Sequence, residues 1–257
     1  MLVVENLSKR FGGLRAVDDC SFNVQHGTIT GLIGPNGAGK TTVFNLLTGF
    51  LKPDSGNVRL GEMSITGLPP HRIFKKGICR TFQIPRELKG MTVLENLMLI
   101  PGRQVGERPW NPFIRPRKVR HQERVICEKA LEVLEFLQLS HLKAEYAENL
   151  SGGQKKLLEL ARTMVADPKV VLLDEPSAGV NRTLLKCLAD AIERVSKEMG
   201  TTFLVIEHDM DFLMRLCSPV IVMSEGRKLA EGTPDEVQRN KEVLNAYLGG
   251  QYAIADG

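Results

Sequence analysis

The sequence lacks any long apolar run. Its strand-like apolar stretches, such as 170–173 and 203–206, are four residues long, whereas a membrane-spanning helix needs roughly 20. The first ten residues include Glu5 and no extended apolar segment, so they do not resemble a secretory signal. We therefore expect any membrane association to depend on a partner protein or on a surface contact.

Cysteine pairs with the spacing of metal-binding or redox motifs are also missing. The five cysteines form no CxxC pair, and their odd number favours reduced, buried thiols over disulfides or a zinc site: Cys20, Cys79, Cys127, Cys187 and Cys217. We therefore expect the protein to work in a reducing compartment.

Outside one segment the sequence has little net charge. The net charge is +4, and between Arg103 and Arg124 seven Arg or Lys residues stand against two Glu. The rest of the chain is then close to neutral. Because general nucleic-acid binding predicts a wider basic footprint, we expect no nucleic-acid partner. The basic segment could approach acidic lipid headgroups, and a solvated charged loop is the alternative.

Strand-like runs alternate with helical patterns along most of the chain, which predicts an α/β fold with a largely parallel sheet. The run at 28–33 leads into a glycine-rich turn and a helix from Lys40. The run at 170–173 is apolar at every position, as in a central strand covered on both faces. The runs at 203–206 and 220–223 have the same character.

The middle of the chain is helical. Thr92 and Glu95 form a capping-box pattern, 123–139 carries an apolar stripe, and Ser151 opens a further helix. Four prolines between 101 and 116 exclude a regular helix there and predict a structured loop. We expect one domain over 1–250, with a core at 1–87 and 166–250, a helical subdomain at 88–165, and a tail at 251–257.

A last helix is predicted near the C-terminus. Thr233 and Glu236 form another capping box, with Pro234 at the first helical position. We expect this helix to run until Gly249 and Gly250 stop it.

A nucleotide P-loop pattern follows the strand-like run at 28–33. Its glycines let backbone N–H groups curl around phosphates, and the next helix points its positive N-terminal end at the same anion. Lys40 is expected to reach the β- and γ-phosphates, and Thr41 to offer a hydroxyl to Mg²⁺. The predicted nucleotide-binding residues here are Gly34, Pro35, Asn36, Gly37, Ala38, Gly39, Lys40, Thr41 and Thr42.

Two carboxylates end the buried run at 170–173. Ligands of parallel sheets bind at the carboxyl edge of the strands. We therefore expect Asp174 to hold Mg²⁺ and Glu175 to polarise the attacking water as a general base.

The sequence LSGGQ at 150–154 resembles the signature of ABC transporter nucleotide-binding subunits, and the resemblance extends from residue 2 to about 250. It implies a P-loop NTPase core with a mostly parallel sheet, an antiparallel β part and a helical insertion. It also implies ATP as substrate and Mg²⁺ as cofactor. Further site residues follow from it: Phe11 and Val17 at adenine, Gln83 at Mg²⁺ or the attacking water, His208 as the switch histidine, and Ser177 and Asn181 in the D-loop.

In this family each active site is completed by the signature of a second subunit. The resemblance therefore implies that Ser151, Gly152, Gly153 and Gln154 act in trans on the γ-phosphate. The second ATPase subunit would be another copy of this chain or a paralogue. A helix N-terminus in that place suits the phosphate charge.

Several segments resemble the ATPases of branched-chain amino acid importers: 11–17, 42–50, 80–83 and 206–210. That resemblance implies two transmembrane permease subunits, an extracytoplasmic binding protein, and a place at the cytoplasmic face of the inner membrane through the permeases. Residues 85–91 are the expected contact with a permease. The alternatives are urea or amide import, lipid or lipopolysaccharide export, and a non-transport ABC ATPase.

Overall fold

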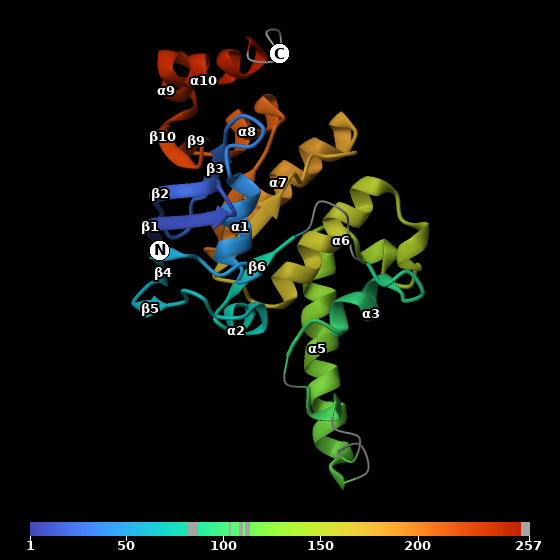
Figure 1. Ribbon diagram of the computed structural model, residues 1–257. Coiled ribbons are helices and arrows are strands. Elements are labelled where there is room, and N and C mark those ends of the chain that lie inside the picture. The colour runs from blue at the N-terminus through green and yellow to red at the C-terminus, as the bar shows by residue number, and fades with distance from the viewer. Residues whose placement is uncertain (82–86, 103, 108–109, 111–113, 253–257) are drawn as a thin grey trace. The chain divides into compact units, whose positions relative to one another are not determined.

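The computed structural model describes residues 1–81, 87–102, 104–107, 110 and 114–252 (Figure 1). The chain forms two compact units. The first comprises Met1–Arg80, Lys169–Ser177 and Ile192–Gly257, and the second comprises Thr81–Pro168 and Ala178–Ala191. The second unit therefore holds 178–191 as well as the helical stretch, whereas the sequence had placed 178–191 in the core.

A six-stranded sheet organises the first unit. Its strand order is β10-β9-β3-β8-β7-β6, in which all neighbours are parallel except β10, which is antiparallel to β9. The strands β7 and β8 are buried at every residue, as strands covered on both faces should be. Their bounds are β3 Ile29–Ile33, β6 Ile78–Arg80, β7 Val170–Asp174, β8 Thr202–Ile206, β9 Val220–Ser224 and β10 Arg227–Gly232.

A second, antiparallel sheet in this unit has the order β2-β1-β4-β5. The first helix, α1 (Lys40–Leu47), contributes Phe44 and Leu47 to a buried cluster that also contains residues of both sheets. The cluster fixes α1, and so the loop before it, against the strand ends. The bounds of this sheet are β1 Leu2–Phe11, β2 Leu14–Val24, β4 Ser55–Leu60 and β5 Met63–Ser64. The expected α/β fold with a mostly parallel sheet and an antiparallel part is confirmed.

The C-terminal helix differs from the prediction. Thr233 forms its capping box, but α9 (Pro234–Arg239) ends after six residues. Asn240 is extended, and its side-chain oxygen accepts the backbone N–H of Glu242 at 2.9 Å, which starts α10 (Lys241–Tyr252). The helix then continues through the two glycines that were expected to stop it. The other helices of this unit are α2 (Pro70–Lys75) and α8 (Met210–Leu216).

The second unit is built from helices. Thr92 forms the predicted capping box of α3 (Val93–Met98). Ser151 opens α6 (Gly152–Val165) as predicted, and it does so through a capping box with Gln154. The helix α5 (Pro116–Phe136) begins earlier than expected because Pro116 sits at its first position, where proline is favoured. It packs on both α3 and α6. Short 3-10 turns are η1 Val105–Glu107, η2 Ser140–Leu142 and η3 Ala147–Asn149, and α7 (Arg182–Met199) starts in this unit.

Close packing explains why the start of α7 joins the second unit. A Cβ atom added at Gly153 of α6 would lie 2.4 Å from a methyl carbon of Leu184. Only glycine allows α7 to come so near. Within the residues that the structure describes, no helix is long and apolar enough to cross a bilayer.

Candidate active site

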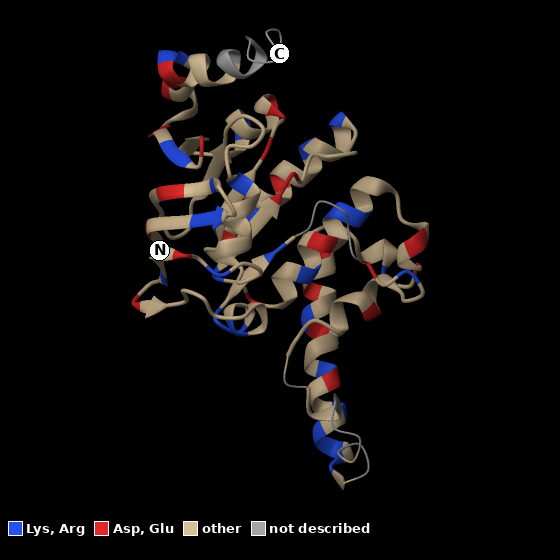
Figure 2. Cartoon of the chain, in the orientation of Figure 1, with Lys and Arg blue, Asp and Glu red and all other residues tan. Residues whose placement is uncertain are grey.

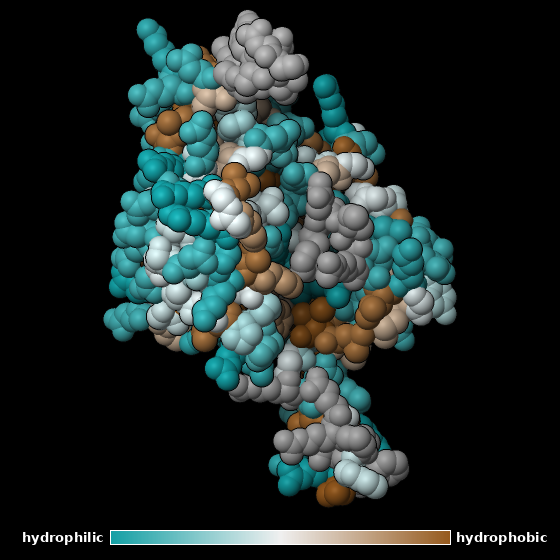
Figure 3. Space-filling model, in the orientation of Figure 1, coloured by the Kyte–Doolittle hydropathy of each residue, from teal (hydrophilic) through white to brown (hydrophobic). Residues whose placement is uncertain are grey.

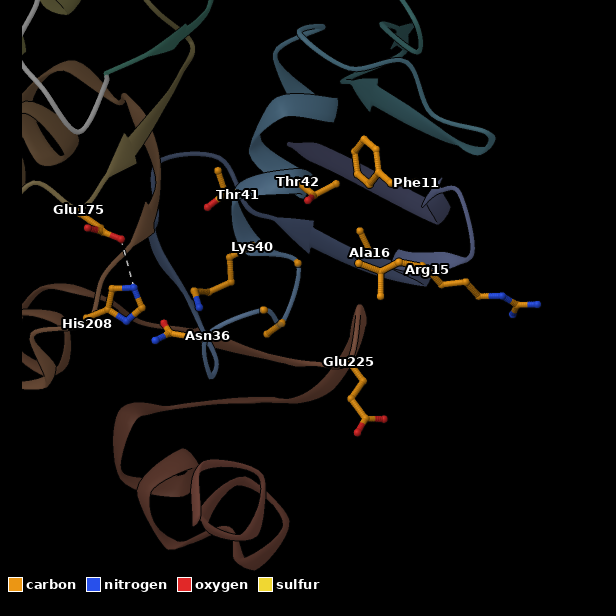
Figure 4. A pocket seen from close by; sticks show the side chains of 14 residues that line it. Phe11, Arg15, Ala16, Asn36, Lys40, Thr41, Thr42, Glu175, His208 and Glu225 are labelled. Atoms are coloured by element: carbon orange, nitrogen blue, oxygen red, sulfur yellow. Dashed lines mark ion pairs between the residues drawn. The ribbon is translucent and has the colours of Figure 1, made fainter. Parts of the chain in front are cut away.

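A cavity of about 610 Å³ opens around the glycine-rich loop of the first unit (Figure 4). Figure 4 shows Glu175 and His208 on one side of Lys40, and Phe11 and Ala16 on the other. The cavity is lined by residues of the loop, of the β1–β2 hairpin and of three strand ends: Phe11, Leu14, Arg15, Ala16, Asn36, Gly37, Ala38, Gly39, Lys40, Thr41, Thr42, Glu175, His208 and Glu225.

The loop backbone requires glycine at two positions. Gly34 has a φ of 152°, and an added Cβ would lie 2.1 Å from the carbonyl oxygen of Met223. Gly39 has a φ of 95°, and its Cβ would lie 2.3 Å from the carbonyl oxygen of Ala16. Gly39 also caps α1 without a side-chain hydrogen bond, and the first turn of α1 has no acidic residue. The N-terminal end of α1 is therefore suited to an anion.

Lys40 supplies the cation of the cavity. Its Nζ donates hydrogen bonds to the carbonyl oxygens of Gly34 at 2.7 Å and Pro35 at 3.0 Å. Burial lowers the pKa of its ammonium, and the negative charge of Glu175 acts in the opposite direction. Gly34 and Pro35 thus accept hydrogen bonds from Lys40 through their carbonyl oxygens. Neither residue lines the cavity.

Glu175 and His208 are brought together although they are distant in sequence. The His208 Nε2 lies 3.1 Å from the Glu175 Oε1 (Figure 4). Glu175 has a φ of 48°, in the left-handed region that residues other than glycine seldom adopt. Such a backbone costs on the order of 1–3 kcal/mol and is characteristic of functional sites. Its N–H donates to the carbonyl oxygen of Ile206 at 2.9 Å, which holds the turn.

One of the two predicted adenine contacts, Val17, does not line the cavity. Phe11 lines the cavity with 46% of its surface exposed, whereas Val17 is completely buried and belongs to the core. Successive side chains of a strand point to opposite faces, so Ala16 faces the cavity when Val17 faces the core. Ala16, rather than Val17, is the cavity residue on β2.

Asp174 does not line the cavity. Its Oδ2 accepts a hydrogen bond from Arg80 Nη2 at 2.7 Å, and the two side chains are only 11% and 8% exposed. Arg80 also donates to Asn45 Oδ1 at 2.6 Å and stacks over the Phe44 ring at 5.6 Å. Sequence analysis missed Arg80, although an arginine at the end of a buried strand is itself a signal of a buried partner.

Glu207 is the second residue that sequence analysis missed. Its side chain is 2% exposed and accepts three backbone N–H groups: Ser177 at 2.7 Å, His208 at 2.9 Å and Asp209 at 3.1 Å. It thus joins the D-loop to the loop that carries His208. A carboxylate directly between a buried strand and His208 was the available signal.

The predicted signature and D-loop residues are mainly helix caps in this structure. Ser151 and Gln154 cap α6 reciprocally, with the Ser151 N–H donating to Gln154 Oε1 at 2.9 Å. The Asn181 side chain accepts the N–H of Leu184 at 2.9 Å. Gly152 is exposed. Their action on a nucleotide stays a prediction, and Gln83 lies outside the described residues.

The chain is similar to known ATP-binding cassettes over nearly all its length. The family described as "ABC transporter" matches residues 17–178, and "Branched-chain amino acid ATP-binding cassette transporter" matches 227–253. A probable branched-chain amino acid transport ATP-binding protein LivG of Archaeoglobus fulgidus is 44% identical over 98% of this chain and 96% of the relative. The high-affinity branched-chain amino acid transport ATP-binding protein BraF of Pseudomonas aeruginosa is 41% identical over 97% and 98%.

Solved structures agree with these relatives. The ADP conformation of an ATP-binding cassette of an ABC transporter superposes with a TM-score of 0.82 and 39% identity, covering 97% of this chain and 98% of that one. A nucleotide-free cassette from an ABC transporter gives the same TM-score and identity over 96% and 98%. With the phosphate loop, the acidic strand end and the histidine gathered at one cavity, these similarities establish that the chain belongs to the ABC transporter family.

Proposed function

We propose that this chain is the ATP-binding and ATP-hydrolysing subunit of an ABC importer for branched-chain amino acids. One observation carries the proposal: a single cavity joins an anion-binding helix start, the Lys40 cation and the Glu175–His208 pair. The amino acid class rests on relatives that are named as branched-chain amino acid transport ATP-binding proteins and are 41–44% identical.

The triphosphate of ATP binds at the start of α1. The N–H groups of the first helical turn have no intrahelical partners and point toward the cavity mouth with the positive end of the helix dipole. Lys40 exchanges the carbonyls of Gly34 and Pro35 for phosphate oxygens, which carry full negative charge and bind an ammonium more strongly. Phe11, exposed at the far side of the cavity, offers its ring to the adenine.

The donor set fits Mg²⁺, which prefers oxygen ligands and takes several of them from substrate phosphates. Thr41 lines the cavity, and Asp174 ends β7 directly before Glu175, which lines it as well. Thr41 and Asp174 would therefore hold the ion, with Gln83 as a further proposed ligand. Bound Mg²⁺ would offset the negative charge of the triphosphate.

Hydrolysis uses the Glu175–His208 pair. Glu175 accepts a proton from the water that attacks the γ-phosphorus, the bond to the β–γ bridging oxygen breaks, and ADP and phosphate leave. His208 holds the Glu175 carboxylate through its Nε2 at 3.1 Å, which keeps the base directed at the cavity. The Lys40 ammonium stabilises charge on the departing phosphate oxygens.

A second ATPase subunit completes each site in this proposal. Ser151 to Gln154 lie at an exposed helix start without an acidic residue in its first turn, which suits a γ-phosphate presented by another copy or a paralogue. The further partners are two membrane permeases and an extracytoplasmic binding protein, which would keep the chain at the cytoplasmic face of the membrane. Residues 85–91 are the proposed permease contact; within them, Glu87 pairs with Lys155 at 3.3 Å.

The ATPase part is tested with Glu175→Gln, which keeps the shape of the side chain but removes the base. We expect ATP turnover to fall by at least about 100-fold while ATP binding persists. Lys40→Ala is the matched control, and it should lose ATP affinity as well as turnover. Turnover at the parental rate in Glu175→Gln would contradict the assignment of the base.

The transport part is tested separately in proteoliposomes that contain the chain, its permeases and the binding protein. ATP-dependent uptake of leucine, isoleucine or valine is the expected result, and it should disappear with Glu175→Gln. Uptake of urea or an amide alone, or active export of lipid, would reject branched-chain amino acid import without affecting the ATPase assignment.

A further inference from the structure

The N-terminal end of α5 carries a surface that the ATPase cycle does not use. We call it the α5 tip and define it by its exposed residues: Trp110, Ile114, Arg115, Arg117, Lys118, Arg120, His121 and Arg124. Figure 2 shows the concentration of blue Lys and Arg residues at this end of the helix. Figure 3 shows hydrophobic and hydrophilic surface side by side at the same place.

The cations of the tip share one face of the helix. Arg117, Arg120 and Arg124 follow a spacing of three and four residues, which stacks side chains on one side of an α-helix. Val119 and Ile126 are buried and take the opposite face against the rest of the unit. The cationic stripe therefore lies on the face of α5 opposite these buried residues. Arg117 and Arg120 have no ion pair to any described residue.

The position of these cations is unfavourable for the isolated helix. A helix N-terminus carries partial positive charge and favours acidic residues. The first turn of α5 has none, and Arg115 at the N-cap makes no side-chain capping hydrogen bond. Arg117 and Lys118 add to the positive pole. The backbone offers an anion little here, because Pro116 has no N–H and the N–H groups of Lys118 and Val119 donate to the carbonyl oxygen of Arg115. An external anion would therefore relieve the repulsion mainly by contacting the side-chain cations.

Two large apolar side chains are exposed shortly before α5 in the chain. Trp110 is 74% exposed and Ile114 is 71% exposed. The N–H of Ile114 donates to the carbonyl oxygen of Trp110 at 3.0 Å, so these two residues lie close to each other. Tryptophan favours the boundary between lipid headgroups and acyl chains, where its ring is buried and its N–H stays wet.

We propose that the α5 tip binds the surface of an anionic phospholipid bilayer, with the arginine stripe against phosphate headgroups and Trp110 and Ile114 in the interfacial layer. Basic residues next to an apolar pair match the two components of such a surface. Nucleic acid fits less well, because the exposed aliphatic Ile114 has no counterpart on a phosphate backbone and the rest of the chain is nearly neutral. This inference rests on the proposed function in one respect, since an ATPase bound to permeases lies close to a membrane.

Trp110 is the only tryptophan in the chain, so its fluorescence reports on this surface alone. The purified full chain is mixed with vesicles of phosphatidylcholine, with or without phosphatidylglycerol. We expect a blue shift of the emission and co-sedimentation with the anionic vesicles only. Both should weaken as salt rises from about 0.1 M to about 1 M, where the screening length falls from about 10 Å to about 3 Å.

Charge variants locate the contact. Arg117→Gln/Arg120→Gln/Arg124→Gln should weaken vesicle binding at least tenfold. Arg72→Gln/Lys75→Gln/Arg239→Gln removes the same charge from exposed residues of the first unit and should leave binding within a factor of two. Ile114→Ser should reduce the blue shift. ATP turnover in solution should be unchanged in all three, so a failed ATPase assignment and a failed lipid assignment give different results.

Three results would overturn the proposal. The first is no binding of the parental chain to anionic vesicles at low salt. The second is equal losses in the two charge variants. The third is duplex DNA binding that is stronger than vesicle binding and is lost in the stripe variant, which would make the α5 tip a nucleic-acid site instead.

Discussion

Arg80 and Asp174 form an ion pair of 2.7 Å that is almost fully buried between the ends of β6 and β7. The same guanidinium donates to Asn45 on α1, the helix that follows the phosphate loop. The acidic strand end and α1 are thus joined by one side chain. The ion pair with Arg80 therefore fixes the position of the Asp174 carboxylate.

Replacing Arg80 by methionine should destabilise the fold. A nearly buried Asp174 would be left without its cation, and breaking a buried pair costs about 3–5 kcal/mol. We expect urea unfolding of Arg80→Met to give a free energy of unfolding lower by about 3 kcal/mol. Arg80→Met/Asp174→Asn should be clearly more stable than the sum of the two single changes predicts, because the amide needs no cation. Additive losses would mean that the pair is not coupled.

Replacing Glu207 by glutamine tests its role as a positioning residue. The carboxylate accepts three backbone N–H groups, and an amide must turn its NH₂ toward at least one of them. We expect a loss of about 1–3 kcal/mol of stability for the donors left unsatisfied. Because His208 is one of these donors, kcat should fall while the KM for ATP changes little.

The matched control is Glu231→Gln, since Glu231 forms a largely solvent-exposed ion pair with Lys228. Exposed pairs contribute about 0–1 kcal/mol, so neither stability nor kcat should change appreciably. If Glu207→Gln behaves like this control, the three hydrogen bonds do not position the site.

The parts of the site that were predictable from sequence are runs of adjacent residues. The loop at 34–41 and the strand end at Asp174–Glu175 each carry their chemistry locally, so spacing alone revealed them. Arg80 and Glu207 escaped because their partners lie far along the chain: 94 residues separate Arg80 from Asp174, and 30 separate Ser177 from Glu207. Only the folded sheet brings them together.

The predictions that differed from the structure failed for a similar reason. Val17 was predicted to contact adenine, but successive side chains of β2 point to opposite faces of the sheet. The register of β2 against β1 decides which of two neighbouring residues faces the cavity. Asn240 interrupts the C-terminal helix through a local side-chain cap, which a pattern of apolar residues does not reveal. Residues 178–191 join the second unit through a close approach of Leu184 to Gly153, a contact between residues distant in sequence.

Thiol labelling should separate the cysteines by burial. Burial raises the pKa of Cys20 to about 11 and those of Cys79 and Cys217 to about 12. A raised thiol pKa leaves less thiolate near neutral pH, and the thiolate is the reactive form. We expect iodoacetamide at about pH 8 to modify the exposed Cys187 first, with the three buried thiols reacting at the rate of unfolding. Peptide mass spectrometry gives the order.

Cys187→Ser should remove the fast labelling phase and leave the slow phases unchanged. Fast labelling of Cys79 or Cys217 in the folded protein would contradict their burial. Labelling of all five thiols in denaturant provides the reference for complete reaction.

The C-terminal helix reaches the phosphate loop through Tyr247. Burial raises the pKa of the Tyr247 hydroxyl, and the backbone of Gly34 acts in the opposite direction, so the hydroxyl lies near the loop. Tyr247→Phe keeps the ring and removes this hydroxyl. A polar contact of this kind contributes at most about 1 kcal/mol, or roughly fivefold in an equilibrium constant. Calorimetric titration should therefore show ATP affinity reduced by up to about fivefold, because the loop loses a fixed anchor.

Tyr146→Phe serves as the control, since Tyr146 is an exposed tyrosine of the second unit, and it should bind ATP like the parental chain. Equal affinities in all three proteins would mean that α10 has no part in shaping the loop.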